Sequence, residues 1–269
     1  MVSVIMGMCY VRSDLNMLER AIRSVLQQTY PNFEFLICEY GSTPEAKACL
    51  HRFEASDSRV VLLMGASPGT LAQNLNRCLA EAKGRYIVRM DDDDFSHPDR
   101  LTKQMAFMKE HLEIAFVGSN VNLCRDGRVV GVRMLPMLPT VKDFYMTQPY
   151  IHPSLLFRRV ALEAVGGYSE DKHCVLCEDY DLLLRLYAKG FRGANLQETL
   201  LDYTVPATTK GNRTMSHRWN ETVTRWRRFL ELGMLPGALP FVVKPLAVGL
   251  LPERVLGELK RKRDMERYR

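Results

Sequence analysis

The first ninety residues alternate between short apolar runs and segments with apolar residues at helical spacing, which constrains the fold more than any other feature. The runs "VSVIMGMCY", "FEFLICEY", "RVVLLMG" and "RYIVRM" are rich in β-branched and aromatic residues. Between them, residues 15–28, 44–55 and 69–84 place apolar side chains every three or four positions, and Gly84 is expected to end the third helix. This order predicts a parallel β-sheet with helices on both faces.

The pattern becomes mixed after residue 95. Ser96 precedes Asp99 by three positions, which resembles a capping box at a helix start. A hairpin is predicted around "RDG", a strand and short helix in "IHPSLLFRRVALEAVGGY", and a helix in "CEDYDLLLRLYAKGF". Beyond about Val205 the pattern is helical and basic. We therefore predict an α/β domain over 1–205, with a mixed, mostly parallel sheet, and a helical appendage over 206–269.

Composition restricts the class of protein. The chain has 269 residues, 46% hydrophobic and 25% charged, which is typical of a globular protein with a sizeable core. A formal charge of +6 is too diffuse to indicate nucleic-acid binding, so none is predicted. The most apolar stretch, 235–252, contains four prolines and a lysine, and is too interrupted to span a bilayer. Seven cysteines, an odd number, and no recognisable signal peptide predict free thiols in a reducing cytoplasm.

Four consecutive aspartates, Asp91 to Asp94, follow the fourth apolar run. If the chain stays extended, alternate carboxylates converge, and two such groups suit a divalent cation that shares its other positions with phosphates. Open α/β sheets bind ligands at the carboxyl ends of their strands, where this cluster lies. The alternative is a solvated acidic loop before a helix. On the residues alone, both interpretations stay open.

A second acidic cluster, Glu178, Asp179 and Asp181, begins a predicted helix. Acidic residues are common at helix starts for electrostatic reasons alone. In the functional interpretation, one carboxylate is a general base and another orients it or binds a substrate hydroxyl. Both acidic clusters lie at element ends that could face one cleft.

Together these segments resemble the family 2 glycosyltransferases with a GT-A fold, particularly the bacterial branch that builds capsular and other surface polysaccharides. The segments "VSVIMGMCY", "AIRSVLQQTYPNFEFLICEYGST", "NLNRCLAEAKGRYIVRMDDDD", "IHPSLLFRRVALEAVGGY" and "EDYDLLLRLYAKGF" have that family's order and spacing. The resemblance implies an inverting, metal-dependent hexosyltransferase. It would move a sugar from a nucleotide-diphosphate donor, expected to be a UDP-sugar, to a hydroxyl of a growing, lipid-linked surface glycan.

The resemblance also implies roles for individual residues. "MDDDD" matches the DxD motif, with Asp91 and Asp93 as its acids and Asp93 as the direct ligand of Mn²⁺ or Mg²⁺. Asp179 matches the catalytic base, with Glu178 beside it. Glu39 occupies the position that contacts uracil. The other expected donor-binding residues are Gly7, Cys9, Tyr10, Tyr40, Asn74, Arg77, Asp91 and Asp92.

This chain departs from the family pattern at several of these positions. Cys9 and Tyr10 stand where members often have Tyr-Asn, and Tyr40 replaces a second acid, so that it could stack on the base or simply pack. Asn74 and Arg77 lie one helical turn apart and could approach the diphosphate, or cap and solvate the helix.

Contacts to the acceptor or the diphosphate are assigned more loosely. His152, Arg213 and His217 are the candidates, and the alternative for His152 is a hydrogen-bonded histidine at a strand end. The pair Cys174 and Cys177 lacks a second pair for a zinc site and predicts a loop beside the acceptor cleft.

The C-terminal sequence has two interpretations, a solvated helix or a contact with an anionic membrane surface at the inner face of the plasma membrane. Two other functions are considered. One is a degenerate GT-A-like protein that binds nucleotide sugars without turnover. The other, a sugar nucleotidyltransferase, is disfavoured because "GMCYVRSD" lacks a glycine-rich phosphate loop.

Overall fold

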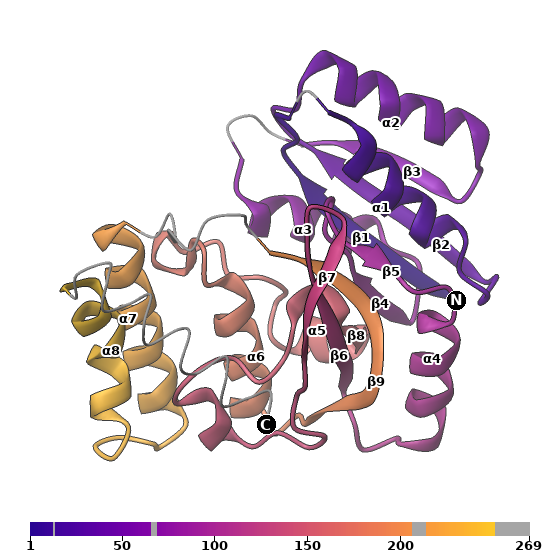
Figure 1. Cartoon of the computed structure of the whole chain (residues 1–269). Coiled ribbons are helices and arrows are strands. Elements are labelled where there is room, and N and C mark those ends of the chain that lie inside the picture. Colours follow the sequence, from indigo (N-terminus) through magenta and orange to yellow (C-terminus); the bar gives the residue numbers. More distant parts are fainter. Residues whose placement is uncertain (13, 66–68, 206–213, 251–269) are drawn as a thin grey trace.

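The computed structural model describes residues 1–12, 14–65, 69–205 and 214–250, and these residues form a nine-stranded mixed sheet with helices on both faces (Figure 1). Eight strands lie in the order β3-β2-β1-β4-β8-β6-β9-β5, and β7 pairs with β6. The architecture confirms the predicted α/β class.

The N-terminal half is the parallel part of the sheet, as its strand–helix alternation predicts. Every residue of β1 and β2 is buried, because helices cover both faces of these strands. The strands in sheet order are β3 (Val60–Met64), β2 (Phe33–Glu39), β1 (Val2–Met8) and β4 (Tyr86–Arg89). The connecting helices are α1 (Asn16–Leu26), α2 (Pro44–Ser56) and α3 (Leu71–Glu81).

The second half continues the sheet with mixed pairing. β8 is antiparallel to β4 and to β6, β6 is parallel to β9, and β5 is antiparallel to β9. The predicted hairpin is confirmed between β6 and β7, where Asp126 and Gly127 both have positive φ, as a tight turn requires. The strands are β5 (Phe95–Ser96), β6 (Phe116–Arg125), β7 (Arg128–Arg133), β8 (Leu156–Arg158) and β9 (Gly193–Thr204).

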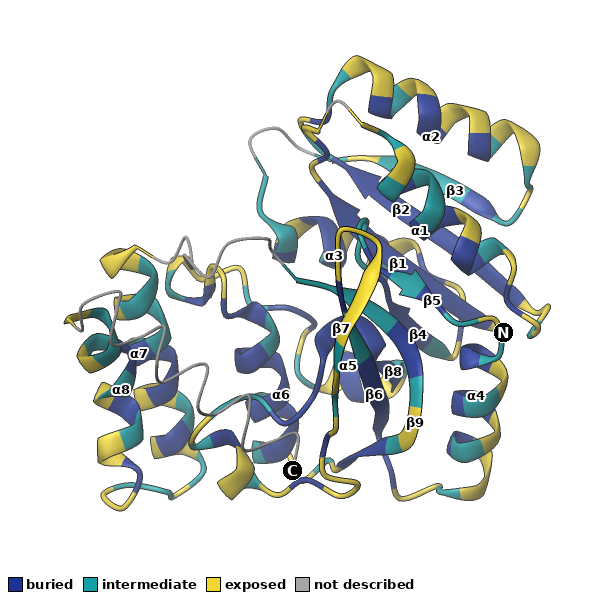
Figure 2. Ribbon diagram, viewed as in Figure 1, coloured by how far each residue is buried: buried dark blue, intermediate teal, exposed yellow. Residues whose placement is uncertain are grey.

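Two apolar clusters hold the helices to the sheet. One packs α1, α2 and α4 (Arg100–Glu110) on one face, and the other packs α3, α5 (Arg159–Ala164) and α6 (Glu178–Ala188) on the opposite face. Figure 2 shows the buried positions running through the sheet and along the inward sides of these helices. The core therefore fixes the carboxyl end of β4 relative to the first turn of α6.

Two details of the sequence analysis are wrong. Ser96 does not cap α4, because it belongs to β5 and pairs with Leu201, and the side chain of the actual N-cap residue, Asp99, makes no capping hydrogen bond. Helix α3 ends at Glu81 rather than at Gly84. Gly84 serves close packing instead, since a Cβ there would lie 2.5 Å from the backbone nitrogen of Ser3.

The described part of the C-terminal segment is helical, as predicted. α7 (Met215–Glu231) packs against α6, and α8 (Leu239–Leu250) packs against α7 at the side of the molecule away from α4 (Figure 1). The predicted boundary after residue 205 opens the segment 206–213, which lies outside the described residues. Within the described ranges, no helix is long and apolar enough to cross a membrane.

Candidate active site

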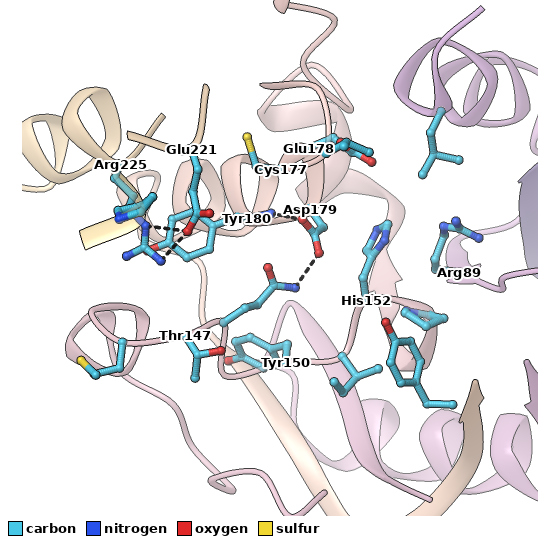
Figure 3. A pocket seen from close by; sticks show the side chains of 18 of the residues that line it. Arg89, Thr147, Tyr150, His152, Cys177, Glu178, Asp179, Tyr180, Glu221 and Arg225 are labelled. Carbon is cyan, nitrogen blue, oxygen red and sulfur yellow. Dashed lines mark hydrogen bonds and ion pairs between the residues drawn. The ribbon is translucent and has the colours of Figure 1, made fainter. Parts of the chain in front are cut away.

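A cavity of about 770 Å³ lies between the carboxyl end of β4, the start of α6 and the helices α7 and α8. Glu178 and Asp179, at the start of α6, line it (Figure 3). Asp91, just after β4, and Tyr203 of β9 line it as well. Its volume is typical of small-molecule sites. The two acidic clusters, far apart in sequence, thus reach one cavity. Asp92 and Asp93 are not among its lining residues.

The first three aspartates of the cluster are crowded. Arg89, which is only 1% exposed, forms an ion pair with Asp91, and Arg12 lies 3.3 Å from Asp93. Burial, followed by repulsion from Asp93 and Asp91, raises the pKa of Asp92 to about 7. Burial and the charge of Asp91 likewise raise the pKa of Asp93. Since these carboxyls resist bearing charge together, a bound cation would stabilise their ionised forms.

Asp94 has a different environment from its three neighbours. Its side chain is buried, and its Oδ1 accepts a hydrogen bond of 2.8 Å from the backbone N–H of Thr204 at the end of β9. Burial raises the pKa of this carboxyl well above its ordinary value. Asp94 therefore joins the aspartate loop to the sheet.

The donor set at Asp91 and Asp93 fits a hard divalent cation. Mg²⁺ and Mn²⁺ prefer carboxylate oxygens, and Mg²⁺ is usually held by only one or two of them, with phosphates and water completing the shell. Within the described ranges, no group of three or more His, Cys, Asp or Glu side chains is placed to hold a metal. A cation here would therefore take its other ligands from water or from a bound molecule.

Both oxygens of Asp179 accept hydrogen bonds. Gln148 Nε2 donates to Oδ2 at 3.1 Å, the dashed contact below Asp179 in Figure 3, and the backbone N–H of Tyr180 donates to Oδ1 at 2.7 Å. The main-chain carbonyl of Gln148 accepts a hydrogen bond from Arg133 Nη2 at 3.1 Å. The sequence analysis missed Gln148, because an isolated glutamine between two elements carries no local signal.

Glu178 lies next to Asp179 but has a distinct protonation behaviour. It is buried, and burial, followed by the neighbouring charge of Asp179, raises its pKa to about 7. Near neutral pH Glu178 is therefore partly protonated, so that Glu178 and Asp179 together carry less than two negative charges. Leu176, two residues earlier, has a φ of 63°, an unusual value for a branched residue, and lines the cavity.

The CxxC segment builds this turn. Cys174 and Cys177 are buried, and the N–H of Cys177 donates to the carbonyl of Cys174 at 2.9 Å. All seven cysteines are free thiols. Cys177 and Leu176 line the cavity, as the prediction of a loop beside a cleft requires.

Arg89 and His152 are buried and line the cavity. His152 Nε2 lies 2.8 Å from the hydroxyl of Tyr168, and burial together with the charge of Arg89 lowers the pKa of His152 well below its ordinary value. His152 is thus neutral at physiological pH. It lines the cavity, as a contact to acceptor or diphosphate would require, and it is also hydrogen bonded, as a structural histidine would be. Both predicted roles are therefore compatible with its position. Arg89 was not predicted, although a charge inside an apolar run was a signal for it.

The residues expected around the nucleotide lie at the ends of β1 and β2. Glu39 is buried and its Oε1 accepts from the N–H of Ser42 at 2.7 Å, with Lys47 Nζ 3.7 Å away. Tyr40 lines a smaller pocket of about 240 Å³ that shares Leu71, Leu176 and Glu178 with the main cavity.

Cys9 and Tyr10 follow β1 directly. Cys9 is exposed, whereas Tyr10 is buried and its hydroxyl donates to the carbonyl of Asp14 at 2.7 Å.

Gly7, Asn74 and Arg77 do not line the cavity. A Cβ on Gly7 would lie 3.2 Å from Leu71 Cδ1, so Gly7 permits the close packing of α3 on β1. Asn74 is buried, and its amide donates to the Thr70 carbonyl at 2.7 Å, a contact within the first turn of α3. Arg77 is exposed on α3.

The two late basic candidates have different outcomes. His217 forms a capping box with Thr214 at the start of α7: its Nδ1 accepts from the N–H of Thr214 at 3.2 Å, and it does not line the cavity. Arg213 lies outside the described residues. The neighbouring Arg218 lines the cavity instead, together with other α7 and α8 residues that the sequence analysis did not predict, namely Glu221, Arg225, Lys244, Pro245 and Val248.

Comparisons with known proteins identify the family of this chain. The sequence profile of "Glycosyl transferase family 2" matches residues 3–165. EpsE of Bacillus subtilis (strain 168), which is named as a glycosyltransferase, is 31% identical over 265 residues, covering 98% of this chain and 94% of EpsE. The Escherichia coli protein WfaP, named as a UDP-Glc:alpha-D-GlcNAc-diphosphoundecaprenol beta-1,3-glucosyltransferase, is 28% identical over 174 residues, 65% of this chain and 66% of WfaP.

Solved structures share the fold at low sequence identity. S. aureus TarS (residues 1–349) in complex with UDP-GlcNAc has a TM-score of 0.67 and 16% identity, covering 99% of this chain and 89% of that one. A mannosyltransferase of Pyrobaculum calidifontis in complex with GDP-Man and Mn²⁺ has a TM-score of 0.62 and 18% identity, covering 98% and 79%. The chain thus has a GT-A fold and belongs to glycosyl transferase family 2.

Proposed function

We propose that the protein is a metal-dependent, inverting glycosyltransferase that transfers a sugar from a UDP-sugar to a hydroxyl of a growing, lipid-linked surface glycan. The observation that carries this proposal is the presence of Asp91 and Asp179 on one cavity. WfaP is named for such a donor and a diphosphoundecaprenol-linked acceptor, and TarS was solved with UDP-GlcNAc, which supports the choice of substrates.

The donor's diphosphate would lie beside the aspartate loop. Asp93 and Asp91 would hold Mn²⁺ or Mg²⁺, which supplies charge neutralisation of the leaving diphosphate when it is bound. The mannosyltransferase of the same fold was solved with Mn²⁺. Arg89 keeps Asp91 oriented through their ion pair. Tyr40 is proposed to contact the base, and Glu39, Cys9 and Tyr10 to shape the neighbouring ends of β1 and β2.

Asp179 is proposed as the general base that takes the proton of the acceptor hydroxyl. The side-chain amide of Gln148 and the backbone N–H of Tyr180 donate hydrogen bonds that hold the carboxylate in place. Glu178, with its pKa raised to about 7, is about half protonated at neutral pH, which weakens it as a second nucleophile. A single well-placed base supports a single displacement with inversion at the anomeric carbon.

Helices α7 and α8 are proposed as the acceptor side of the site, because Arg218, Glu221 and Lys244 of these helices line the same cavity as Asp179. The segment 206–269 would also contact the membrane that carries a lipid-linked acceptor, at the inner face of the plasma membrane. The basic sequence "PERVLGELKRKRDMERYR" supports this placement through attraction to anionic lipid.

Binding without turnover is the second candidate, favoured by one observation. The Glu39 carboxylate already accepts a hydrogen bond from the Ser42 N–H. One of its oxygens is therefore already engaged before a nucleotide base could bind. Release of UDP from a UDP-sugar in the presence of Mn²⁺ excludes this candidate, since a pure binding protein releases none.

A thermal-shift panel tests the proposed donor and metal together. UDP-glucose, UDP-GlcNAc and GDP-mannose are each added with Mn²⁺ and with a chelator. A ligand that binds only the native state raises the Tm, so at least one UDP-sugar should do so, and more strongly with Mn²⁺. If no nucleotide sugar changes the Tm in either condition, the proposal fails.

A further inference from the structure

Helix α7 carries an apolar stripe on its solvent side. Met215, Trp219, Trp226 and Leu230 are separated by four, seven and four positions, which places them on one face of a helix. All four are exposed, with Trp219 at 53% and Trp226 at 48%. We refer to these four residues as the tryptophan stripe. Exposing two tryptophans on one helix face is costly unless something covers them.

The neighbouring helix extends the apolar character. α8 contains a single charged residue, Lys244, and exposes Leu239, Val243 and Leu250. It packs directly on α7, where Arg218 Nη1 donates to the Pro245 carbonyl at 3.3 Å. Figure 2 marks exposed positions along the outer sides of both helices. The helix pair therefore combines a polar inner side, which lines the cavity, with an apolar outer side.

We infer that the tryptophan stripe is a membrane-docking surface that lies in the interface of an anionic bilayer. Tryptophan suits this environment because its ring is apolar while its indole N–H prefers the hydrated headgroups. This inference rests on the proposed function, since a lipid-linked acceptor would then enter the cavity from the helices that rest on the lipid.

Charge favours an anionic lipid surface over a second copy of this chain. Residues 251–269, which follow α8 directly, contain seven Lys and Arg against four Asp and Glu. Such a basic sequence is attracted to anionic headgroups. Two copies joined through their stripes would bring two basic sequences together. The described charges of α7 are largely neutralised, for example Arg225 by Glu221 and Arg227 by Asp171.

Trp219 and Trp226 are the only tryptophans of the chain, so intrinsic tryptophan fluorescence reports on this surface alone. The full-length protein is mixed with vesicles of phosphatidylcholine, or of phosphatidylcholine with phosphatidylglycerol, and with the same vesicles carrying brominated acyl chains. We expect a blue shift and quenching by the brominated lipid with the anionic vesicles, and a weaker response to phosphatidylcholine alone.

Flotation with the same anionic vesicles tests the residues. The double variant Trp219→Ser/Trp226→Ser should bind about tenfold more weakly or worse, because two large apolar side chains no longer leave water. The control is Leu112→Ser, which removes a 77% exposed apolar side chain just beyond the end of α4, away from α7, and should bind as the native protein does.

Three results would overturn the inference. They are no spectral change and no quenching with anionic vesicles, equal flotation of the double variant, and a blue shift without lipid that grows with protein concentration as dimers form. Hydrolysis of a UDP-sugar, which releases UDP, is measured on the same samples. Docking without UDP release would count against the proposed transferase activity only, and UDP release without docking against the membrane contact only.

Discussion

Gln148 Nε2 donates a hydrogen bond of 3.1 Å to Oδ2 of Asp179, and so joins the segment before β8 to the first turn of α6. A carboxylate at a helix start can turn about its side-chain bonds unless a second element holds it. This contact and the N–H of Tyr180 fix both oxygens of the proposed base. The orientation of Asp179 therefore depends on a residue 31 positions away in sequence.

Replacing Gln148 should reduce turnover without weakening donor binding. A hydrogen bond to a charged group contributes about 1.5–3 kcal/mol, so Gln148→Ala should lower kcat by about ten- to a hundredfold. Steady-state kinetics with the UDP-sugar as varied substrate gives kcat and KM separately. The control is Gln197→Ala, whose amide donates to the main-chain carbonyls of Leu135 and Asn195 and lies outside the cavity. A rise in donor KM at unchanged kcat would show that Gln148 has a different role.

Two adjacent aspartates should respond in opposite ways to replacement by alanine. Asp93→Ala should abolish the effect of Mn²⁺ and weaken UDP-sugar binding by at least about tenfold, as expected when a metal site loses a ligand. Its stability should change little, because its ion pair with Arg12 is half-exposed.

Asp94→Ala should instead leave the response to Mn²⁺ intact. It leaves the N–H of Thr204 without its acceptor and should cost about 1–3 kcal/mol of stability. Urea unfolding and calorimetric titration of both variants measure the two properties. A stable Asp94→Ala protein that no longer responds to Mn²⁺ would reverse the assignment.

Glu178 should make stability depend on pH. Its pKa is raised from 4.5 to about 7 by burial and by Asp179, so between these values the folded protein keeps a proton that the unfolded chain has released. The free energy of unfolding therefore falls as pH rises through this window, and the cost is complete above pH 7.

Glu178→Gln removes this titration. Above pH 7 the variant should be more stable than the native protein by about 3 kcal/mol at most, and below pH 4.5 the difference should vanish. Urea unfolding at both pH values measures the difference. Glu163→Gln, at an exposed position on α5, should show almost no difference at either pH. An equal effect of both substitutions would contradict the assigned environment of Glu178.

The parallel half of the fold could be predicted because its information is local. Runs such as "FEFLICEY" are buried on both faces and read as strands without knowledge of their neighbours. β9 could not be predicted in this way, because "GANLQETLLDYT" mixes charged and apolar residues and forms a strand through pairing with the long β6. β5, with two residues, is a strand only because β9 lies beside it.

The residues of the candidate site likewise differ in how much local sequence information marks them. Asp91, Asp93 and Asp179 lie in motifs that can be recognised from their own segments. Gln148 acts through Asp179, a partner 31 positions away that the fold brings to it, and no local pattern marks such a residue. Arg89, whose ion-pair partner Asp91 is local, carries only the signal of a charge inside an apolar run.

Asp179→Asn is the sharpest test of the assigned general base, because it keeps the shape of the side chain and removes its basicity. We predict that UDP release in the presence of acceptor falls by at least about a hundredfold while the Kd for the UDP-sugar with Mn²⁺ stays unchanged. Asp126→Asn, in the turn between β6 and β7 where Asn tolerates the positive φ, should match the native protein in both measurements. Full turnover by Asp179→Asn would contradict the account.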